Sequence, residues 1–178
     1  MIIIKSTKFE KASNACFFRI KKMKEIIDAS ANKDIAGIAS MLFLEYATEL
    51  NVDLCFQNFS QELEDPLFKY GPPSGALFMA FYNNEPAGCI ALQPISLAKT
   101  CEMKRLYVKP ECRNMGIATT LVETLTNRAK ELGYTRMVLD TLDKLVPAIA
   151  LYKHHGFIET TSYYNNPLPG VVYMAKEL

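Results

Sequence analysis

The chain has 178 residues, of which 49% are hydrophobic and 22% charged, a composition typical of one soluble domain with a sizeable core. A formal net charge of +1 gives no global field that would favour a nucleic acid or a membrane surface as partner. No apolar run approaches the ~18 residues that a membrane-spanning helix needs.

The five cysteines and two histidines show no metal-binding or redox spacing. No two cysteines form a close C-x-x-C pair, and an odd number without a pattern fits reduced thiols. His154 and His155 are adjacent, so on a helix they would lie on different faces instead of sharing a metal ion. We therefore expect a cytoplasmic protein without a metal site.

Residues 1–22 differ in character from the rest of the chain. Met1–Ile4 is apolar, the stretch after it is basic and irregular, and Met23 directly precedes a regular pattern. The segment is either a leader or an extra strand, or the working domain simply begins at Met23. A secretory signal is disfavoured because the apolar run is short and precedes the charges. We assign residues 23–178 to a single domain.

From residue 24 onward, apolar periodicity predicts alternating strands and helices. The first helix begins at a capping residue, Asn32 or Asp34, and residues 65–75 are expected to form a loop because prolines and glycines interrupt them. The predicted strands cover 25–29, 76–82, 87–95, 99 or 100 to 108, 134–141, 157–163 and 171–176, and the further helices 58–64, 117–132 and 147–155.

A helix between two strands implies a parallel βαβ unit around residues 117–132, because parallel strands need such a crossover. The last two strands are expected to form a hairpin. No internal repeat or low-complexity segment occurs in the sequence. The predicted fold class is a single α/β domain.

The loop Arg113-Asn114-Met115-Gly116-Ile117-Ala118 leads from a predicted strand into a predicted helix. The first backbone N–H groups of a helix lack partners within the helix, and together with the helix dipole they favour an anion. Gly116 lets a bound group approach the backbone, and Arg113 adds a planar cation suited to phosphate. The loop therefore indicates a pyrophosphate site, although an ordinary loop and cap would also account for it.

Two stretches resemble the GCN5-related N-acetyltransferase (GNAT) family. Arg113-x-x-Gly116-x-Ala118 is similar to the acyl-CoA loop of that family, and residues 148–157 are similar to its A-x-x-L-Y-x-x-x-G-F signature. The resemblance runs from about residue 25 to residue 178 and is strongest over 102–157. It implies a mixed central sheet, splayed in the middle and flanked by helices.

The resemblance also implies acetyl-CoA as co-substrate, with no metal. The pantetheine amides would pair with the backbone of the strand before the loop, where an opened sheet leaves polar groups unpaired. The implied pantetheine-binding residues are Leu106, Tyr107 and Val108, and the implied pyrophosphate-binding residues are Arg113, Asn114, Met115, Gly116, Ile117, Ala118 and Thr119.

Two residues match catalytic positions of the family. Tyr152 holds the general-acid position, from which a phenol could give a proton to the departing CoA sulfur. Glu102 matches the position of a glutamate base in several members, but it could equally be an amine anchor or a partner of Lys104. Period-two alternation places Glu102, Lys104, Leu106 and Val108 on one side of the strand, unless a bulge intervenes.

The acceptor is less constrained by the sequence. Many members carry an asparagine where this chain has Leu145, so one common cofactor hydrogen bond is expected to be absent or replaced. The substrate side is expected to be built from the first helices and the loops 65–75 and 163–170. Their aromatic and acidic residues would form a rim that suits a small-molecule amine, although these residues could also be ordinary surface and core. The alternatives are a peptide or protein amine, or a non-catalytic acyl-CoA sensor; a homodimer is possible. The acidic members of the rim are Glu45, Glu49, Glu62, Glu64 and Asp65.

Overall fold

The structure, a computed structural model, describes residues 23–30 and 32–178. The alternatives for residues 1–22 lie outside the described part. Within that part, seven strands form one sheet in the order β1-β2-β3-β4-β5-β7-β6. The strands are β1 (Lys24–Asp28), β2 (Ala76–Tyr82), β3 (Glu85–Pro94), β4 (Thr100–Val108), β5 (Arg136–Leu142), β6 (Ile158–Glu159) and β7 (Val171–Glu177).

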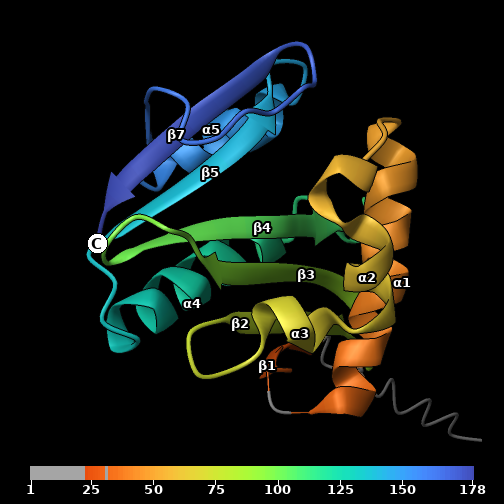
Figure 1. Ribbon diagram of the computed structural model, residues 1–178. Coiled ribbons are helices and arrows are strands. Elements are labelled where there is room, and N and C mark those ends of the chain that lie inside the picture. The colour runs from red at the N-terminus through yellow and green to blue at the C-terminus, as the bar shows by residue number, and fades with distance from the viewer. Residues whose placement is uncertain (1–22, 31) are drawn as a thin grey trace, which may run out of the picture.

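The helices cover both faces of this sheet (Figure 1). One apolar cluster joins one face to α4 and α5, and a second joins the other face to α1 and α3. Asn32 caps the start of α1, where its side chain accepts hydrogen bonds from two backbone N–H groups, as its residue type predicts. The helices are α1 (Lys33–Leu50), α2 (Phe59–Glu64), α3 (Pro66–Tyr70), α4 (Ile117–Glu131) and α5 (Val146–His154).

The sheet is splayed between β4 and β5, as the family resemblance implies. These two strands are parallel, and they pair only over three positions, from Thr100 opposite Arg136 to Glu102 opposite Val138. Beyond that point the strands diverge (Figure 1). All other neighbours in the sheet are antiparallel, and β6 pairs with β7 as predicted for the last two strands.

Two predicted elements are wrong in detail. The expected loop over residues 65–75 contains α3, with the Asp65 carboxylate as cap and Pro66 in the first turn. Proline breaks a helix interior but is favoured at the first position, where its missing N–H has no partner to lose. The strand expected over 157–163 is reduced to Ile158–Glu159. In the described residues, no helix is both long and apolar enough to cross a membrane.

Candidate active site

A cavity lies between β4 and β5, on the side where the two strands diverge. Met103 to Leu106 line it from β4, and Leu139 to Leu142 line it from β5. Tyr152 of α5 also lines this cavity, which we call the inter-strand cavity. The cavity lies where an extended ligand could pair with the free edge of β4.

The loop before α4 has the form expected of an anion cradle. Gly116 is the residue before the helix at φ +74°, and no side chain caps this helix end. A Cβ on Gly116 would have only the Lys24 ammonium within 4 Å, at 3.9 Å, so there is open space in front of the backbone N–H groups. Lys24 Nζ also donates to Thr120 Oγ1 at 2.8 Å, which holds a cation beside the cradle. The chain therefore has room and charge for a phosphate group here.

Arg113 is not free to act as expected. Its guanidinium Nη2 donates to both Glu49 carboxylate oxygens, at 2.7 and 2.6 Å, and its Nε donates to the Val108 carbonyl at 3.0 Å. Both side chains of the Arg113–Glu49 pair are about half exposed. A role for Arg113 in holding phosphate thus requires exchange of Glu49 for the ligand and stays a prediction.

The expected alternation along β4 is wrong beyond Lys104, because a bulge intervenes. Arg105 lies at φ +56°, and the register with β3 shifts between Cys89 and Ala91. Leu106 and Val108 consequently join the cluster on the α4 face, whereas Tyr107 packs on the α1 face. Of the three expected pantetheine-binding residues, Leu106 lines the inter-strand cavity.

Tyr152 is a buried phenol at the wall of the inter-strand cavity. Its side chain packs edge-on against Phe157, with ring centroids 6.0 Å apart. Burial raises the pKa of Tyr152 well above its ordinary value, so the hydroxyl keeps its proton at neutral pH. The group is therefore a hydrogen-bond donor at the place where the family resemblance expects an acid.

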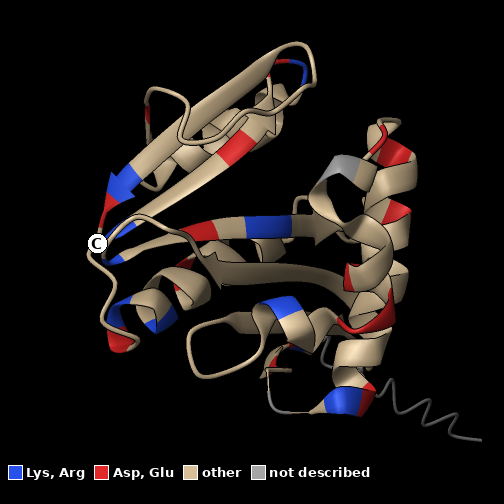
Figure 2. Cartoon of the chain, in the orientation of Figure 1, with Lys and Arg blue, Asp and Glu red and all other residues tan. Residues whose placement is uncertain are grey.

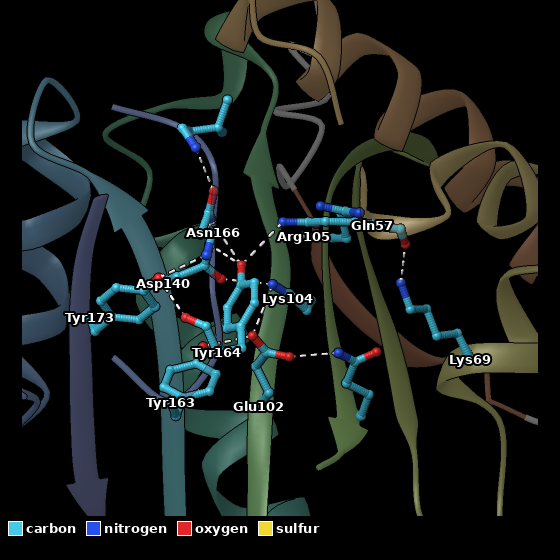
Figure 3. A network of polar contacts seen from close by, with 12 residues as sticks. Gln57, Lys69, Glu102, Lys104, Arg105, Asp140, Tyr163, Tyr164, Asn166 and Tyr173 are labelled. Carbon is cyan, nitrogen blue, oxygen red and sulfur yellow. Dashed lines mark hydrogen bonds and ion pairs between the residues drawn. The ribbon is translucent and has the colours of Figure 1, made fainter. Parts of the chain in front are cut away.

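Glu102 is 3% exposed, and both of its carboxylate oxygens have partners (Figure 3). Its Oε1 accepts from the Tyr163 hydroxyl at 2.6 Å and lies 2.9 Å from Lys104 Nζ. Its Oε2 accepts from Gln93 Nε2 at 2.6 Å. Of the three roles left open for Glu102, partnership with Lys104 is present in the structure.

Lys104 connects the part of the splayed sheet that contains β4 to the part that contains β5. Its ammonium lies 2.7 Å from Asp140 of β5 as well as beside Glu102 of β4. Burial would lower the pKa of Lys104, but the two carboxylates outweigh it and raise the pKa. Burial would likewise raise the pKa of Asp140, but Lys104 and hydrogen bonds from Tyr164 and Asn166 lower it. Both groups are therefore charged at neutral pH.

A second pocket adjoins Glu102 on the other side of this network. We call it the acceptor pocket; it shares Gln57 and Lys104 with the inter-strand cavity. Gln57 Oε1 is buried and has no hydrogen-bond partner in the structure. The remaining lining residues are Lys69, Gln93, Ile95, Ser96, Leu97, Glu102, Tyr163, Tyr164 and Asn165.

Most of the carboxylates expected to form an acidic rim for an amine are instead paired with a cation or cap a helix. Glu49 pairs with Arg113, Glu45 lies 3.2 Å from Lys109, and Glu62 is buried against Arg105. The Asp65 carboxylate caps α3. Leu145, at the family's asparagine position, packs against an apolar cluster. Figure 2 shows that charged residues also lie on β4 and β5 themselves.

Sequence reasoning missed Asp140 and Gln93. Asp140 follows the apolar run Met137 to Leu139, and a carboxylate in such a place is an uncommon feature that could have drawn attention to it. Tyr163 and Tyr164 lie in the loop expected on the substrate side, but their contacts with Glu102 and Asp140 were not predicted. Their position depends on the tertiary fold.

Comparison with known sequences agrees with this architecture. A family model described as the acetyltransferase (GNAT) family matches residues 44–157. An uncharacterised N-acetyltransferase of Schizosaccharomyces pombe is 48% identical over 139 residues, covering 78% of this chain and 85% of the relative. An uncharacterised N-acetyltransferase of Dictyostelium discoideum is 34% identical, covering 80% of this chain and 93% of the relative.

Solved structures share the fold. A GNAT acetyltransferase of Staphylococcus aureus gives a TM-score of 0.70 at 22% identity, covering 87% of this chain and 99% of that one. A GNAT acetyltransferase of Elizabethkingia anophelis with acetyl-CoA bound gives a TM-score of 0.61 at 25% identity, covering 87% and 98%. The splayed sheet and its flanking helices define the fold of an N-acetyltransferase. The chain belongs to the GNAT family and is an enzyme of that class.

Proposed function

We propose that this enzyme transfers the acetyl group of acetyl-CoA to the primary amine of a small molecule, by direct attack in a ternary complex. The observation that carries the proposal is the meeting of two pockets. The inter-strand cavity and the acceptor pocket share Gln57 and Lys104, beside Glu102. Two substrates bound in these pockets would lie against the same two side chains and so close to each other, and such positioning is a large source of rate enhancement.

The cradle and the inter-strand cavity fit the parts of acetyl-CoA. Backbone N–H groups from Arg113 to Thr119 would hold the pyrophosphate, with Lys24 beside them. The free edge of β4 at Leu106 to Val108 would pair with the pantetheine amides. When bound, acetyl-CoA supplies the activated thioester carbonyl.

Side chains of the enzyme would accept and donate the protons that move during the transfer. The amine nitrogen bonds to the carbonyl carbon as the carbon–sulfur bond breaks, so nitrogen loses one proton and sulfur gains one. The Tyr152 hydroxyl donates to sulfur and recovers the proton that nitrogen releases. Glu102 accepts from three groups, and a carboxylate has about four acceptor sites, so one site is left to anchor the amine. Gln57 Oε1 is a further acceptor for the amine at the junction of the pockets.

A relative supports a small primary amine as acceptor. The Caenorhabditis elegans thialysine N-epsilon-acetyltransferase is 33% identical over 87 residues, covering 47% of this chain and 54% of the relative. Its name describes transfer of an acetyl group to the epsilon nitrogen of thialysine. We extend only the small-molecule amine to the present enzyme, and the acceptor itself is taken up below.

The test is thermal unfolding with and without acetyl-CoA, for the parent and for Gly116→Tyr. At about 100 times its dissociation constant, the ligand should stabilise the parent by roughly 2.7 kcal/mol. Gly116→Tyr should lose this stabilisation, because the new ring fills the space in front of the cradle. Gly133→Tyr is the matched control. Gly133 also has positive φ, at the other end of α4, with open space around a Cβ.

Both variants force a side chain into left-handed backbone, which costs about 1–2 kcal/mol in each case. The difference between them in response to acetyl-CoA therefore reports the cradle alone. An equal response of Gly116→Tyr and the parent would show that the cradle lies elsewhere. No response of the parent would refute acetyl-CoA as co-substrate.

A further inference from the structure

The acceptor pocket adjoins two ionic clusters of opposite net charge. At one end, the carboxylates of Glu102 and Asp140 share the single ammonium of Lys104, which leaves one negative charge. At the other end, Lys69 and Arg105 share the single carboxylate of Glu62, which leaves one positive charge. Glu102 and Lys69 both line the pocket.

The positive charge that faces the pocket belongs to Lys69. Arg105 binds both carboxylate oxygens of Glu62, and these side chains are only 3% and 0% exposed. Lys69 is 23% exposed; its Nζ donates to the Gln57 carbonyl at 2.8 Å and lies 3.3 Å from Glu62. An ammonium has three N–H donors, so one remains for a ligand in the pocket.

The wall between the two charges is suited to a short organic chain. Ile95 and Leu97 provide apolar surface, and the side-chain amides of Gln57 and Gln93 are neutral. Figure 3 shows Lys69 coming from the opposite side of the site to Glu102, with Gln57 between Lys69 and Tyr164. A ligand in this pocket would meet a cation at one end and an anion at the other.

We propose that the acceptor is a free amino acid or a close analogue, whose amine lies beside Glu102 and whose carboxylate pairs with Lys69. The inference rests on the acetyltransferase function proposed above and deepens it. A polyamine would bring a second positive charge toward Lys69. A lysine side chain within a protein carries no carboxylate at a fixed distance from its amine. Charge complementarity therefore favours a zwitterion over both.

The experiment compares amino acids with their amides, which keep the amine and the chain but lose the negative charge. Rates of CoA thiol release are measured with a series of acids that differ in the number of carbons between amine and carboxylate. For the preferred length, kcat/KM should be at least about tenfold higher for the acid than for its amide, which corresponds to ~1.4 kcal/mol. The difference should lie mainly in KM, because the carboxylate is remote from the reacting atoms.

Lys69→Met tests the assignment of the residue. The ratio of kcat/KM between acid and amide should fall to about one, because the acid loses the cation that pairs with its carboxylate and the amide has no such pair to lose. Glu62 keeps Arg105 as a partner in this variant. Lys33→Met is the matched control, since Lys33 is exposed in the first turn of α1 and lines neither pocket. It should keep the ratio of the parent.

Three results would overturn the inference while leaving the acetyl-CoA site intact, as judged by thermal unfolding. They are failure to acetylate any acid in the series, faster acetylation of the amides, polyamines or peptide lysines, and an equal loss for acid and amide in Lys69→Met. The last result would assign Lys69 to folding. Absence of acetyl-CoA binding by the parent would instead refute the underlying function.

Discussion

The environment of Tyr152 determines what its hydroxyl can do. Burial raises its pKa, so the phenol does not release its proton to solvent at neutral pH. It can still give a proton to a group that becomes strongly basic beside it, such as a departing thiolate. The residue is thus suited to act in the transition state and not before it.

Tyr152→Phe should reduce kcat by about 100-fold, at the low end of what general acid–base catalysis contributes. Stabilisation by acetyl-CoA in thermal unfolding should be unchanged, because the ring and its packing remain. Tyr134→Phe is the control: it removes a hydroxyl that donates to the Ser74 carbonyl at 2.8 Å, outside both pockets. Unchanged turnover of Tyr152→Phe would remove Tyr152 from the acid role.

Single residues also show how far the sequence carried the prediction of the site. Gly116 and Tyr152 could be proposed as site residues because short motifs of the family contain them. Glu102 could be proposed because it matches the position of a glutamate base in several members of the family. Its partner Tyr163 comes from a segment 61 positions away, and no local pattern announces such a contact.

At the scale of elements, the bulge in β4 has a visible consequence. It turns Arg105 toward the α2 side of the sheet, where it meets the buried carboxylate of Glu62. The guanidinium also lies over the ring of Phe59, 5.2 Å from its centroid. The pair thereby fastens α2 to the central strand, close to the acceptor pocket.

Glu62→Ala should destabilise the enzyme by about 3–5 kcal/mol, because it leaves the buried guanidinium of Arg105 without its carboxylate. Glu131→Ala is the comparison. Its pair with Arg128 is exposed, so its loss should cost less than ~1 kcal/mol. Denaturant unfolding of both variants measures the difference. Similar small losses would mean that the Arg105–Glu62 pair does not fasten α2.

Element boundaries were predicted well where periodicity is strong. The predicted helix over 117–132 is observed as Ile117–Glu131, and the strand over 76–82 is observed unchanged. The bulge could not be located, because a positive φ at an arginine has no sequence signature. The short helix α3 was missed because its proline was interpreted as a breaker.

At the scale of the whole molecule, residues 23–30 and 32–178 by themselves supply a sheet with an apolar cluster on each face. We therefore expect that a chain beginning at Met23 folds and keeps its stabilisation by acetyl-CoA. Thermal unfolding of the full chain and of this shortened chain, with and without ligand, measures both properties. Aggregation of the shortened chain, or loss of its response to ligand, would make the first 22 residues part of the domain.

The splay itself has a mechanical consequence. In the part of the chain that the structure describes, β4 and β5 pair over only three positions, so bending between β1–β4 and β5–β7 would disturb few main-chain hydrogen bonds. Side-chain contacts also join the two sides of the opening, chiefly Lys104 with Asp140 and Tyr163 with Glu102. A molecule bound between β4 and β5 would take the place of the backbone pairing that these strands lack and would make this part of the sheet more rigid. A ligand that enters the opening between β4 and β5 would therefore also hold the two parts of the sheet together.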